Sequence, residues 1–427
     1  MEMYTVAIIG CGSRGHDAFG LNLLRKKNKF KIVALCDVLK EKADRCAREF
    51  EVPFENVFYE EETFFQEKRA DAIIIATHDR DHVRMAIKAL SLGYAILMEK
   101  PISPIKEELL RLLDTHKQYP QPVMICHVLR YAPAYVKIKK LLEQGTIGRL
   151  LSIDWLEQVC YWHQSHSYVR GNWRREEDSS PMIMAKCCHD LDLLQWYAEA
   201  KSVSVYSIGE RMFFNKENAP FDAANRCFEC KYNKDCPYSA EYQYIDRWKK
   251  VGSPKSCWPW NVIDDSLVNT EESLRNAYKN GEYGRCVFAC DNDVVDHQVV
   301  VTCFENGVVA NLTMTAFAND GGRRATFRGS LGEIEFNQTE DSIRISQYGK
   351  ETCIYKLGEW LKSELEDTFG HGGGDTKLID GFYDLLSQGV QTGTTLENSV
   401  ESHLMALAAE ESRKQGRVCL LSEFRKE

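Results

Sequence analysis

The sequence predicts an α/β fold in two parts: an N-terminal Rossmann domain (a doubly wound parallel sheet) and a C-terminal α/β domain with a large, open, mostly antiparallel sheet. Up to about residue 127, apolar runs alternate with helical segments at the short spacing typical of right-handed βαβ units. Longer segments of two-residue polar–apolar alternation follow, as expected for strands with one covered face. We therefore predict domains at 1–127 and 128–427.

Each predicted element rests on its own pattern. In the first part, short apolar runs predict buried strands at 4–10, 30–37, 70–77, 94–101 and 122–128. The segments between them predict helices at 16–27, 79–93 and 105–118. In the second part, strands are predicted at 149–162, 293–304, 307–318 and 323–337, and helices at 132–145, 376–389 and 399–416. A polar, aromatic stretch with weak periodicity, at about 211–285, reads as an insertion.

The size and charge of the chain limit its function. It has 427 residues, enough for two or three domains, and a formal net charge of −9. That charge disfavours nucleic acid and anionic membranes as partners, because both call for a basic face. No apolar run is long enough to span a bilayer, and the N-terminus does not resemble a signal peptide. We therefore expect a cytoplasmic protein with a small-molecule substrate.

A glycine-rich turn follows the first predicted strand. The segment GCGSRG places Gly10, Gly12 and Gly15 in the G-x-G-x-x-G spacing of dinucleotide-binding turns. Gly10 permits a tight turn, Gly12 lets a pyrophosphate approach the backbone, and Gly15 lets helix and strand pack closely. The following helix points its N-terminus at the phosphates. The turn therefore predicts a dinucleotide cofactor.

The second predicted strand ends in a carboxylate that indicates which dinucleotide binds. Asp37 lies 22 residues past Gly15, where an acidic side chain accepts hydrogen bonds from the adenosine ribose hydroxyls. A carboxylate there repels a 2′-phosphate, so we expect NAD rather than NADP.

Further motifs give the chain a family resemblance. Glu99-Lys100-Pro101 follows the strand predicted from residue 94, and Arg130-Tyr131, GTIGRL at 145–150, GNWR at 171–174 and His189 come later. Together with the glycine turn, this set resembles the Gfo/Idh/MocA family of NAD(P)-dependent oxidoreductases over nearly the whole chain. The resemblance implies sugars, polyols or related cyclic alcohols as substrates. It also implies a homo-oligomer, a dimer or tetramer, since the large sheet of such proteins often packs between subunits.

The resemblance implies a catalytic set. In the family, a histidine and an aspartate four residues before it act beside the lysine of the E-K-P motif. His189 matches the histidine, but Ala185 stands where the aspartate is expected, and Lys186 stands three residues before His189, on the same face if this segment is a helix. The predicted catalytic residues are Lys100, His189 and Lys186. Lys100 would stabilise a developing alkoxide and His189 would take the proton, although the missing aspartate leaves the general base open.

The motifs also predict which residues bind the cofactor and which bind the substrate. The predicted cofactor-binding residues are Gly10, Gly12, Ser13, Arg14, Gly15, Asp37, Thr77, His82, Glu99 and Lys100. Two segments, 160–175 and the glycine-rich 370–375, are dense in side chains that hydrogen-bond or stack on sugars. With them, the predicted substrate-binding residues are Arg130, Tyr161, His163, His166, Tyr168, Arg170, Trp173, Arg174, Asp192, His371 and Asp375.

The insertion carries a cysteine pattern typical of a structural metal site. Cys227 and Cys230 form a C-x-x-C pair, Cys236 follows six residues later, and Cys257 lies further on. Four thiolates complete a tetrahedral zinc shell, so we predict zinc held by these four residues. Cys286 and Cys290 compete with Cys257 for the fourth place, and an iron–sulfur cluster is the less favoured alternative.

Three functions fit these motifs. The first is an NAD-dependent oxidoreductase that transfers a hydride between a ring hydroxyl of a sugar or polyol and NAD. The second is an NAD-dependent glycoside hydrolase, which works by oxidation, elimination, hydration and reduction. The third, of another class, is a non-catalytic sensor that binds NAD or sugar on the same fold. The presence of both Lys100 and His189 favours an enzyme.

Overall fold

The first sheet of the computed structural model, which describes residues 2–264, 266, 268–390 and 393–426, is a six-stranded parallel sheet. Its order is β3-β2-β1-β4-β5-β6. The strands are β1 (Tyr4–Ile9), β2 (Phe30–Cys36), β3 (Val57–Phe58), β4 (Ala72–Ile75), β5 (Ala95–Met98) and β6 (Val123–Ile125). The order reverses at β1, so the carboxyl ends of β1 and β4 border the crevice in which doubly wound sheets bind ligands.

Helices cover this sheet, and every residue of β4 and β5 is buried. The N-terminal helices are α1 (Leu21–Arg25), α2 (Lys40–Glu49), α3 (Glu61–Phe64), α4 (His82–Ser91) and α5 (Lys106–Gln118). The helix predicted at 16–27 is in fact composite, because a π-helical turn at Arg14–Gly20 precedes α1. An added Cβ on Gly20 would lie 2.3 Å from the Phe50 ring, so this turn packs more closely than a larger residue allows.

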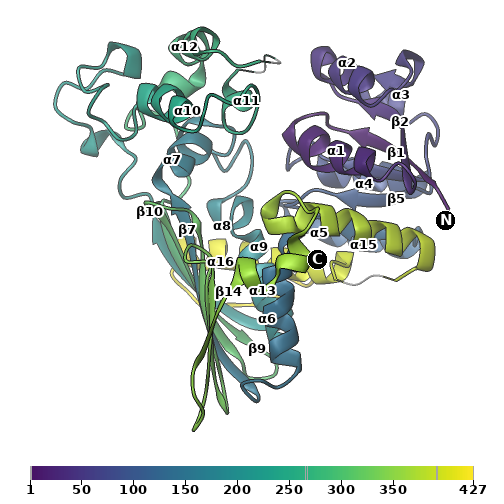
Figure 1. Cartoon of the computed structure of the whole chain (residues 1–427), viewed down its shortest axis with the longest axis vertical. Coiled ribbons are helices and arrows are strands. Elements are labelled where there is room, and N and C mark those ends of the chain that lie inside the picture. Colours follow the sequence, from purple (N-terminus) through teal and green to yellow (C-terminus); the bar gives the residue numbers. More distant parts are fainter. Residues whose placement is uncertain (1, 265, 267, 391–392, 427) are drawn as a thin grey trace.

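The C-terminal end of the chain returns to the first sheet. Helices α15 (Gly374–Gln388) and α16 (Leu396–Gln415) lie beside the Rossmann elements (Figure 1). Lys26 Nζ lies 2.6 Å from Asp380 Oδ1 on α15, and the Ile102 amide donates to His403 Nε2 on α16 at 2.9 Å. The two parts therefore share one continuous apolar core.

The second sheet has nine strands in the order β14-β13-β12-β11-β7-β10-β9-β8-β15. Only β7 and β10 pair in parallel, and the other neighbours are antiparallel. The strands are β7 (Leu150–Cys160), β8 (Ser202–Glu210), β9 (His297–Phe304), β10 (Val309–Ala318), β11 (Gly322–Gly329), β12 (Gly332–Asn337), β13 (Ser342–Gln347), β14 (Cys353–Lys356) and β15 (Cys419–Leu420). Both sheets agree with the predicted fold class, which is confirmed.

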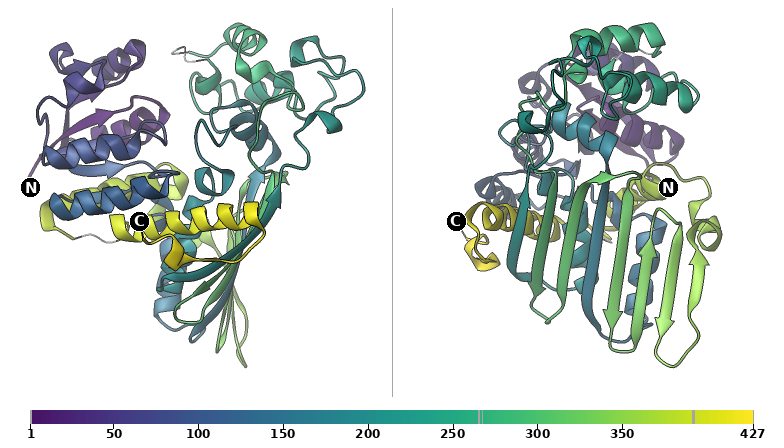
Figure 2. Two further views of the ribbon diagram at one scale, coloured as in Figure 1. Left: turned by 180° about the vertical axis from the view of Figure 1, so that it is seen from behind. Right: turned by 90° about the vertical axis from the view of Figure 1, so that its left-hand side faces the viewer.

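One face of this sheet is covered by helices. Helices α6 (Pro133–Glu143), α9 (Cys188–Ala198) and α16 lie behind it, and the other face is open toward the viewer (Figure 2, right). Burial alternates along β10 and β11, which is the pattern of strands with one covered face. Segment 323–337, predicted as one strand, is instead a hairpin of β11 and β12 that turns between Gly329 and Gly332.

The insertion leaves the large sheet between β8 and β9. It contains α10 (Arg247–Lys250), α11 (Trp260–Ile263) and α12 (Glu271–Asn280), and lies above the end of the sheet, across from α1 and α2 (Figure 1). It has an apolar core of its own, made of Cys227, Ala240, Tyr244, Ile245, Trp248, Trp260, Leu274 and Tyr278. Within the described part of the chain, no helix has the length and apolar character needed to cross a membrane.

Candidate active site

The glycine turn has the conformation that its sequence predicts. Gly10 has a φ of 93°, and an added Cβ there would lie 2.4 Å from the Ala76 carbonyl oxygen. An added Cβ on Gly15 would lie 1.8 Å from the Gly10 carbonyl oxygen, so both positions require glycine. A Cβ on Gly12 would meet no atom within 4 Å. The turn is therefore tight at its two ends and open in the middle, which fits the close approach of a pyrophosphate.

Asp37 stands directly after β2, next to the glycine turn. Its Oδ2 accepts a hydrogen bond from the Cys11 amide at 2.7 Å, and its Oδ1 accepts one from the Leu39 amide at 2.8 Å. These two bonds fix the carboxylate, and each oxygen keeps acceptor capacity for a ribose hydroxyl. The neighbouring Val38 is exposed and carries no charge that would hold a 2′-phosphate. This geometry fits NAD.

Arg14 extends from the glycine turn toward the E-K-P motif and the C-terminal part. Its Nε pairs with Glu99, and its Nη2 lies 3.0 Å from Asp375 Oδ1 and 3.3 Å from Cys126 Sγ. The other predicted cofactor contact in the turn, Ser13, donates its hydroxyl to Asp17 Oδ2 at 2.9 Å. Arg14 thus joins three segments that are distant in the sequence.

His82 and Thr77 connect two backbone segments that border the site. The buried His82 ring places Nδ1 2.7 Å from the Pro101 carbonyl oxygen and Nε2 3.2 Å from the Thr77 carbonyl oxygen. It therefore ties the segment after β4 to the E-K-P turn after β5. The Thr77 hydroxyl lies 3.5 Å from the Met85 sulfur. In this structure, both residues position the backbone around the site.

The E-K-P motif stands at the carboxyl end of β5. The buried Glu99 accepts a hydrogen bond from the Lys100 amide at 2.9 Å. Burial acts to raise the pKa of Glu99, but the charges of Arg14 and Lys100 outweigh it and lower that pKa, so Glu99 is a carboxylate. Burial acts against the charge of Lys100, whereas Cys188 and Glu99 favour it, and its pKa is raised. Lys100 is therefore an ammonium held next to a fixed anion.

His189 lies in the first turn of α9. Its side chain is almost fully buried, and among the described residues its Nδ1 has no hydrogen-bond partner. Burial, and then the neighbouring Lys100 and His127 side chains, lower the pKa of His189 well below its ordinary value. The imidazole is consequently neutral near pH 7, which is the form that a general base requires.

Lys186 does not share a helix with His189. It lies in the turn between α8 (Met182–Ala185) and α9, so the expected common helical face is wrong. Its Nζ lies 3.0 Å from Glu157 Oε1 on β7. The Glu157 carboxylate also lies 3.0 Å from the Arg323 guanidinium, which pairs with Asp190 at 2.7 Å. Lys186 thus ends a buried ionic chain, and its catalytic role remains a prediction.

The rings of Tyr168 and Trp258 both contact the ring of His163, and the three form an aromatic wall. His163 ends the short helix α7 (Tyr161–His163), and its ring centroid lies 5.7 Å from that of Tyr168. Burial lowers the pKa of His163 well below its ordinary value, and the neighbouring Lys186, His166 and Lys100 side chains add to this effect. His163 is therefore within the electrostatic reach of Lys100 and Lys186.

Sequence reasoning missed two residues of this region. Trp258, in the insertion, is 38% exposed, and its ring centroid lies 4.8 Å from that of His163. In the sequence, the two tryptophans of segment KSCWPW, at 255–260, are the pattern that could have indicated this residue. His127, just after β6, is fully buried, and neither ring nitrogen has a hydrogen-bond partner among the described residues. Its ring lies 6.0 Å from that of His189. No local pattern distinguishes this histidine in the sequence.

Several predicted substrate contacts are occupied by protein partners. Arg130 pairs with Asp192 through two contacts of 2.7 Å, both side chains being buried. His166 Nδ1 lies 3.1 Å from the Tyr244 hydroxyl. The remaining members have these partners: Tyr161 with Tyr242, Arg170 with Gln243 and the Tyr238 carbonyl, Trp173 with Tyr168, and Arg174 with Asp291. These contacts stabilise the walls of the site, and substrate roles for these residues remain predictions.

The glycine-rich loop before α15 meets the cofactor turn. His371 Nδ1 lies 2.8 Å from Asp375 Oδ2, and the other oxygen of Asp375 contacts Arg14. Burial acts to raise the pKa of Asp375, but the bond from His371 and the charge of Arg14 lower it to about 2. The loop therefore places a permanent anion beside the glycine turn.

The predicted metal ligands do not all meet. Cys227, Cys230 and Cys236 line one small cavity together with Cys286, whereas Cys257 packs against the apolar core of the insertion. Cys257 does not line this cavity, so the ligand set that includes it stays a prediction that the cavity does not support. Across the described ranges, no group of three or more Cys, His, Asp and Glu side chains is already placed to hold a metal ion, so the zinc prediction is not supported as made.

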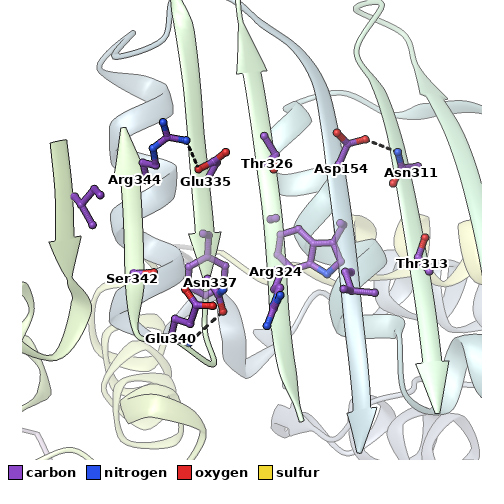
Figure 3. A pocket seen from close by; sticks show the side chains of 15 residues that line it. Asp154, Asn311, Thr313, Arg324, Thr326, Glu335, Asn337, Glu340, Ser342 and Arg344 are labelled. Carbon is purple, nitrogen blue, oxygen red and sulfur yellow. Dashed lines mark hydrogen bonds and ion pairs between the residues drawn. The ribbon is translucent and has the colours of Figure 1, made fainter. Parts of the chain in front are cut away.

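A hollow of about 660 Å³ lies elsewhere, on the open face of the large sheet (Figure 3). Its polar side chains largely pair with one another: Asp154 accepts a bond from Asn311, and Arg344 lies 2.9 Å from Glu335. Lys100 and His189 do not line it. Although this hollow is large, it lacks the predicted catalytic residues, so we do not assign the reaction to it.

The fold and the residues around Lys100 define a dinucleotide-binding oxidoreductase. The chain belongs to the Gfo/Idh/MocA oxidoreductase family, whose NAD-binding Rossmann model matches residues 4–127 and whose C-terminal alpha/beta model matches residues 139–420. The resemblance predicted from the motifs is thereby confirmed.

Individual relatives are more distant. Putative oxidoreductase YteT of Bacillus subtilis is 25% identical over 394 residues, which cover 89% of each chain. An inositol 2-dehydrogenase of Corynebacterium glutamicum is 28% identical over 202 residues, covering 47% of this chain and 56% of the relative. Among solved structures, levoglucosan dehydrogenase in complex with NADH and levoglucosan has a TM-score of 0.72 at 17% identity, covering 98% of this chain and all of that one. That likeness shows the fold alone.

Proposed function

We propose that this protein transfers a hydride between a ring hydroxyl of a sugar or polyol and NAD. The observation that carries this proposal is that the buried His189, in the first turn of α9, is neutral and lies within the electrostatic reach of a charged Lys100 at the carboxyl end of β5. Oxidation of a secondary alcohol needs both a positive group at the oxygen and a base for its proton.

The chain's own groups divide this work. Lys100 donates a hydrogen bond to the substrate oxygen and stabilises the negative charge that develops there. His189, whose Nδ1 has no partner among the described residues, accepts the hydroxyl proton. When bound, NAD supplies the hydride acceptor. Positioned proton transfer of this kind contributes roughly 10²–10⁴-fold to a rate.

Cofactor choice follows from the glycine turn and Asp37. The open position at Gly12 accommodates the pyrophosphate, and Asp37 accepts bonds from the ribose hydroxyls. Arg14 lies between Glu99 and Asp375, where it is available to a phosphate that approaches the turn.

Substrate class follows from the aromatic wall. Tyr168 and Trp258 both contact the ring of His163, and His163 lies within the electrostatic reach of Lys100 and Lys186. Aromatic faces pack well on the apolar C–H surface of a sugar ring, while neighbouring polar groups bind its hydroxyls. Some relatives are inositol 2-dehydrogenases, which act on a cyclic polyol.

A second candidate is an NAD-dependent glycoside hydrolase. The observation that favours it is His163, a second, half-buried histidine whose pKa is lowered by burial and by the neighbouring Lys186 and Lys100. Elimination and hydration need such an additional acid–base group. His166, which is bonded to Tyr244, is not suited to that task.

One experiment separates the candidates. The purified protein is incubated with NAD and a panel of inositols, aldoses and nitrophenyl glycosides, and NADH and released nitrophenol are measured together. We expect NADH to form in proportion to the alcohol consumed. Nitrophenol release with catalytic NAD and no net NADH would identify the hydrolase instead. Binding of NAD and sugar without turnover of any compound would identify a sensor.

We further propose a homo-oligomer that packs through the open face of the large sheet. Val301, Val309 and Phe317 are large apolar residues that are exposed on strands with alternating burial. Exposed apolar residues on one sheet face are typical of subunit interfaces. Light scattering of the purified chain, compared with a Val301→Glu/Val309→Glu variant, tests this: the variant should be smaller.

A further inference from the structure

Four cysteine side chains surround one small cavity in the insertion. The cavity has a volume of about 20 Å³, which is enough for a single atom-sized occupant. Cys227, Cys230 and Cys236 come from one segment, and Cys286 comes from the far end of the insertion. The rest of the lining is formed by Arg170, Pro220, Ala223, Tyr232, Asn233, Tyr238, Ser239, Val287 and Phe288.

The backbone holds the first three cysteines in place by local hydrogen bonds. Cys227 begins a 3₁₀ turn that ends at Glu229, and the Cys230 amide donates to the Cys227 carbonyl oxygen at 3.2 Å. The Cys236 amide donates to the Tyr232 carbonyl oxygen at 2.9 Å. Two successive turns therefore bring three thiols to the same side of the segment.

Cys286 joins them through contacts between distant segments. Arg226 and Arg285 form an antiparallel β-bridge, which sets Cys286 opposite Asn225 and leaves Cys227 and Cys286 as diagonal neighbours across the bridge. The Cys286 amide also donates to the Asn225 carbonyl oxygen at 2.8 Å. The fourth thiol is thus fixed by tertiary structure and not by its distance along the chain.

The buried cation Arg170 lines this cavity and has no carboxylate partner among the described residues. The Arg170 side chain is fully buried, with its Nε 2.7 Å from the Arg285 carbonyl oxygen and its Nη2 3.5 Å from Cys227 Sγ. Its other partners, Gln243 and the Tyr238 carbonyl, are also neutral, so no acidic side chain of the described residues pairs with it. Buried charges are strongly disfavoured unless they are paired. The surroundings of Arg170 therefore require an anion, and the thiols are the available source.

We propose that Cys227, Cys230, Cys236 and Cys286 bind one Zn²⁺ as thiolates. Each thiol that binds releases its proton to solvent, and four thiolates around Zn²⁺ leave a net charge of two minus. Arg170 offsets part of that charge, which explains why an arginine is buried there. The sulfurs are not already drawn into a coordination shell, so binding turns the side chains toward the cavity.

The proposed ion is structural. Four thiolates fill a tetrahedral shell and leave no open position for substrate. The ion ties segment 227–236 to the chain just before β9, and so closes the insertion at its base. Its position in the fold is distinct from Lys100 and His189, which do not line this cavity.

The test compares Cys286 with Cys257, the two cysteines that compete for the fourth ligand position. Zinc is measured by elemental analysis in the full-length protein, in Cys286→Ser and in the control Cys257→Ser. We expect about one zinc per chain in the wild type and in Cys257→Ser, and at least a tenfold loss in Cys286→Ser. A chain purified without zinc that takes up none when Zn²⁺ alone is added would overturn the proposal. Iron in place of zinc, or zinc lost from Cys257→Ser but kept by Cys286→Ser, would overturn it too.

A second measurement does not depend on the folding of a variant. Co²⁺ is added to metal-free wild-type protein, and the visible spectrum is recorded. Four thiolates give intense tetrahedral d–d bands together with sulfur-to-cobalt charge-transfer absorption, and we expect both. Added Zn²⁺ should abolish them at one equivalent. A weak octahedral spectrum would contradict the proposed site.

Discussion

Arg14 Nη2 lies 3.0 Å from Asp375 Oδ1, so the glycine turn after β1 is joined directly to the loop that precedes α15. The two residues are 361 positions apart in the chain. The cofactor turn and the C-terminal part are therefore linked by an ion pair, next to the E-K-P motif that Arg14 also contacts.

This pair gives the first prediction, on stability. The pKa of Asp375 is about 2, below its ordinary value, so the folded state binds its proton less readily than the unfolded chain. Asp375→Asn should lower the free energy of unfolding by about 2 kcal/mol above pH 5. The difference from wild type should shrink as pH falls from about 4 toward 2. Urea unfolding at a series of pH values measures it, and a loss that is independent of pH would contradict the prediction.

The second prediction concerns cofactor choice. Asp37→Ser combined with Val38→Arg should reduce the preference for NAD over NADP, because it removes the carboxylate that repels a 2′-phosphate and adds a positive charge. Titration with both cofactors gives the ratio of dissociation constants. Asp44→Asn is the control, since that carboxylate accepts its bond from Tyr59 on the outer side of α2. Wild-type protein that binds NADP as tightly as NAD would disprove the role of Asp37.

The third prediction concerns turnover. Lys100→Ala and His189→Ala should each reduce kcat by about a hundredfold or more while leaving the Kd for NAD within a few-fold, because both groups act mainly in the transition state. His116→Gln, a change on the outer helix α5, serves as the control. Near wild-type kcat in either variant would remove that residue from the mechanism.

The fourth prediction is a pH profile. Burial and the charge of Lys100 hold the pKa of His189 well below 6.5. The imidazole therefore stays unprotonated when the pH falls to 6.5. kcat/KM should therefore remain flat as pH falls from 8 through about 6.5, the ordinary histidine pKa, and decline only below it. An acidic limb centred near pH 6.5 would argue against His189 as a buried base.

Three histidines with lowered pKa values affect stability in the same direction as Asp375. A group with a lowered pKa that is neutral in the fold binds protons more readily when unfolded, so stability falls as pH drops below about 6.5. His127, His163 and His189 all belong to this class. Some acid destabilisation is therefore expected in wild type, and the test of Asp375 relies on the difference between variants.

The fifth prediction concerns Trp258. Trp258→Ala should raise the KM for the sugar or polyol about tenfold with little change in the Kd for NAD, because it removes an aromatic face beside His163. Trp258→Phe should retain most of the affinity. Phe221→Ala is a matched control, since that ring is also in the insertion but is 88% exposed. An unchanged KM in Trp258→Ala would exclude the residue from the substrate pocket.

The sequence by itself determined the features that depend on a few consecutive residues. Gly10 and Gly15 are required by the conformation and close packing of one turn, and Asp37 and Lys100 follow directly from strand ends. Such features are readable because backbone geometry and strand direction fix them locally. The two-part fold was predictable for the same reason, since each strand and helix carries its own period.

Only the tertiary structure decided which distant segments meet. The turn before α9 pairs Lys186 with Glu157, and Trp258 reaches His163 from the insertion. A β-bridge, and not spacing along the chain, selects Cys286 over Cys257 as the fourth thiol at the cavity. These contacts depend on strand register and on the packing of one segment against another, which are set by the sum of many weak interactions across the whole core and leave no local pattern in the sequence.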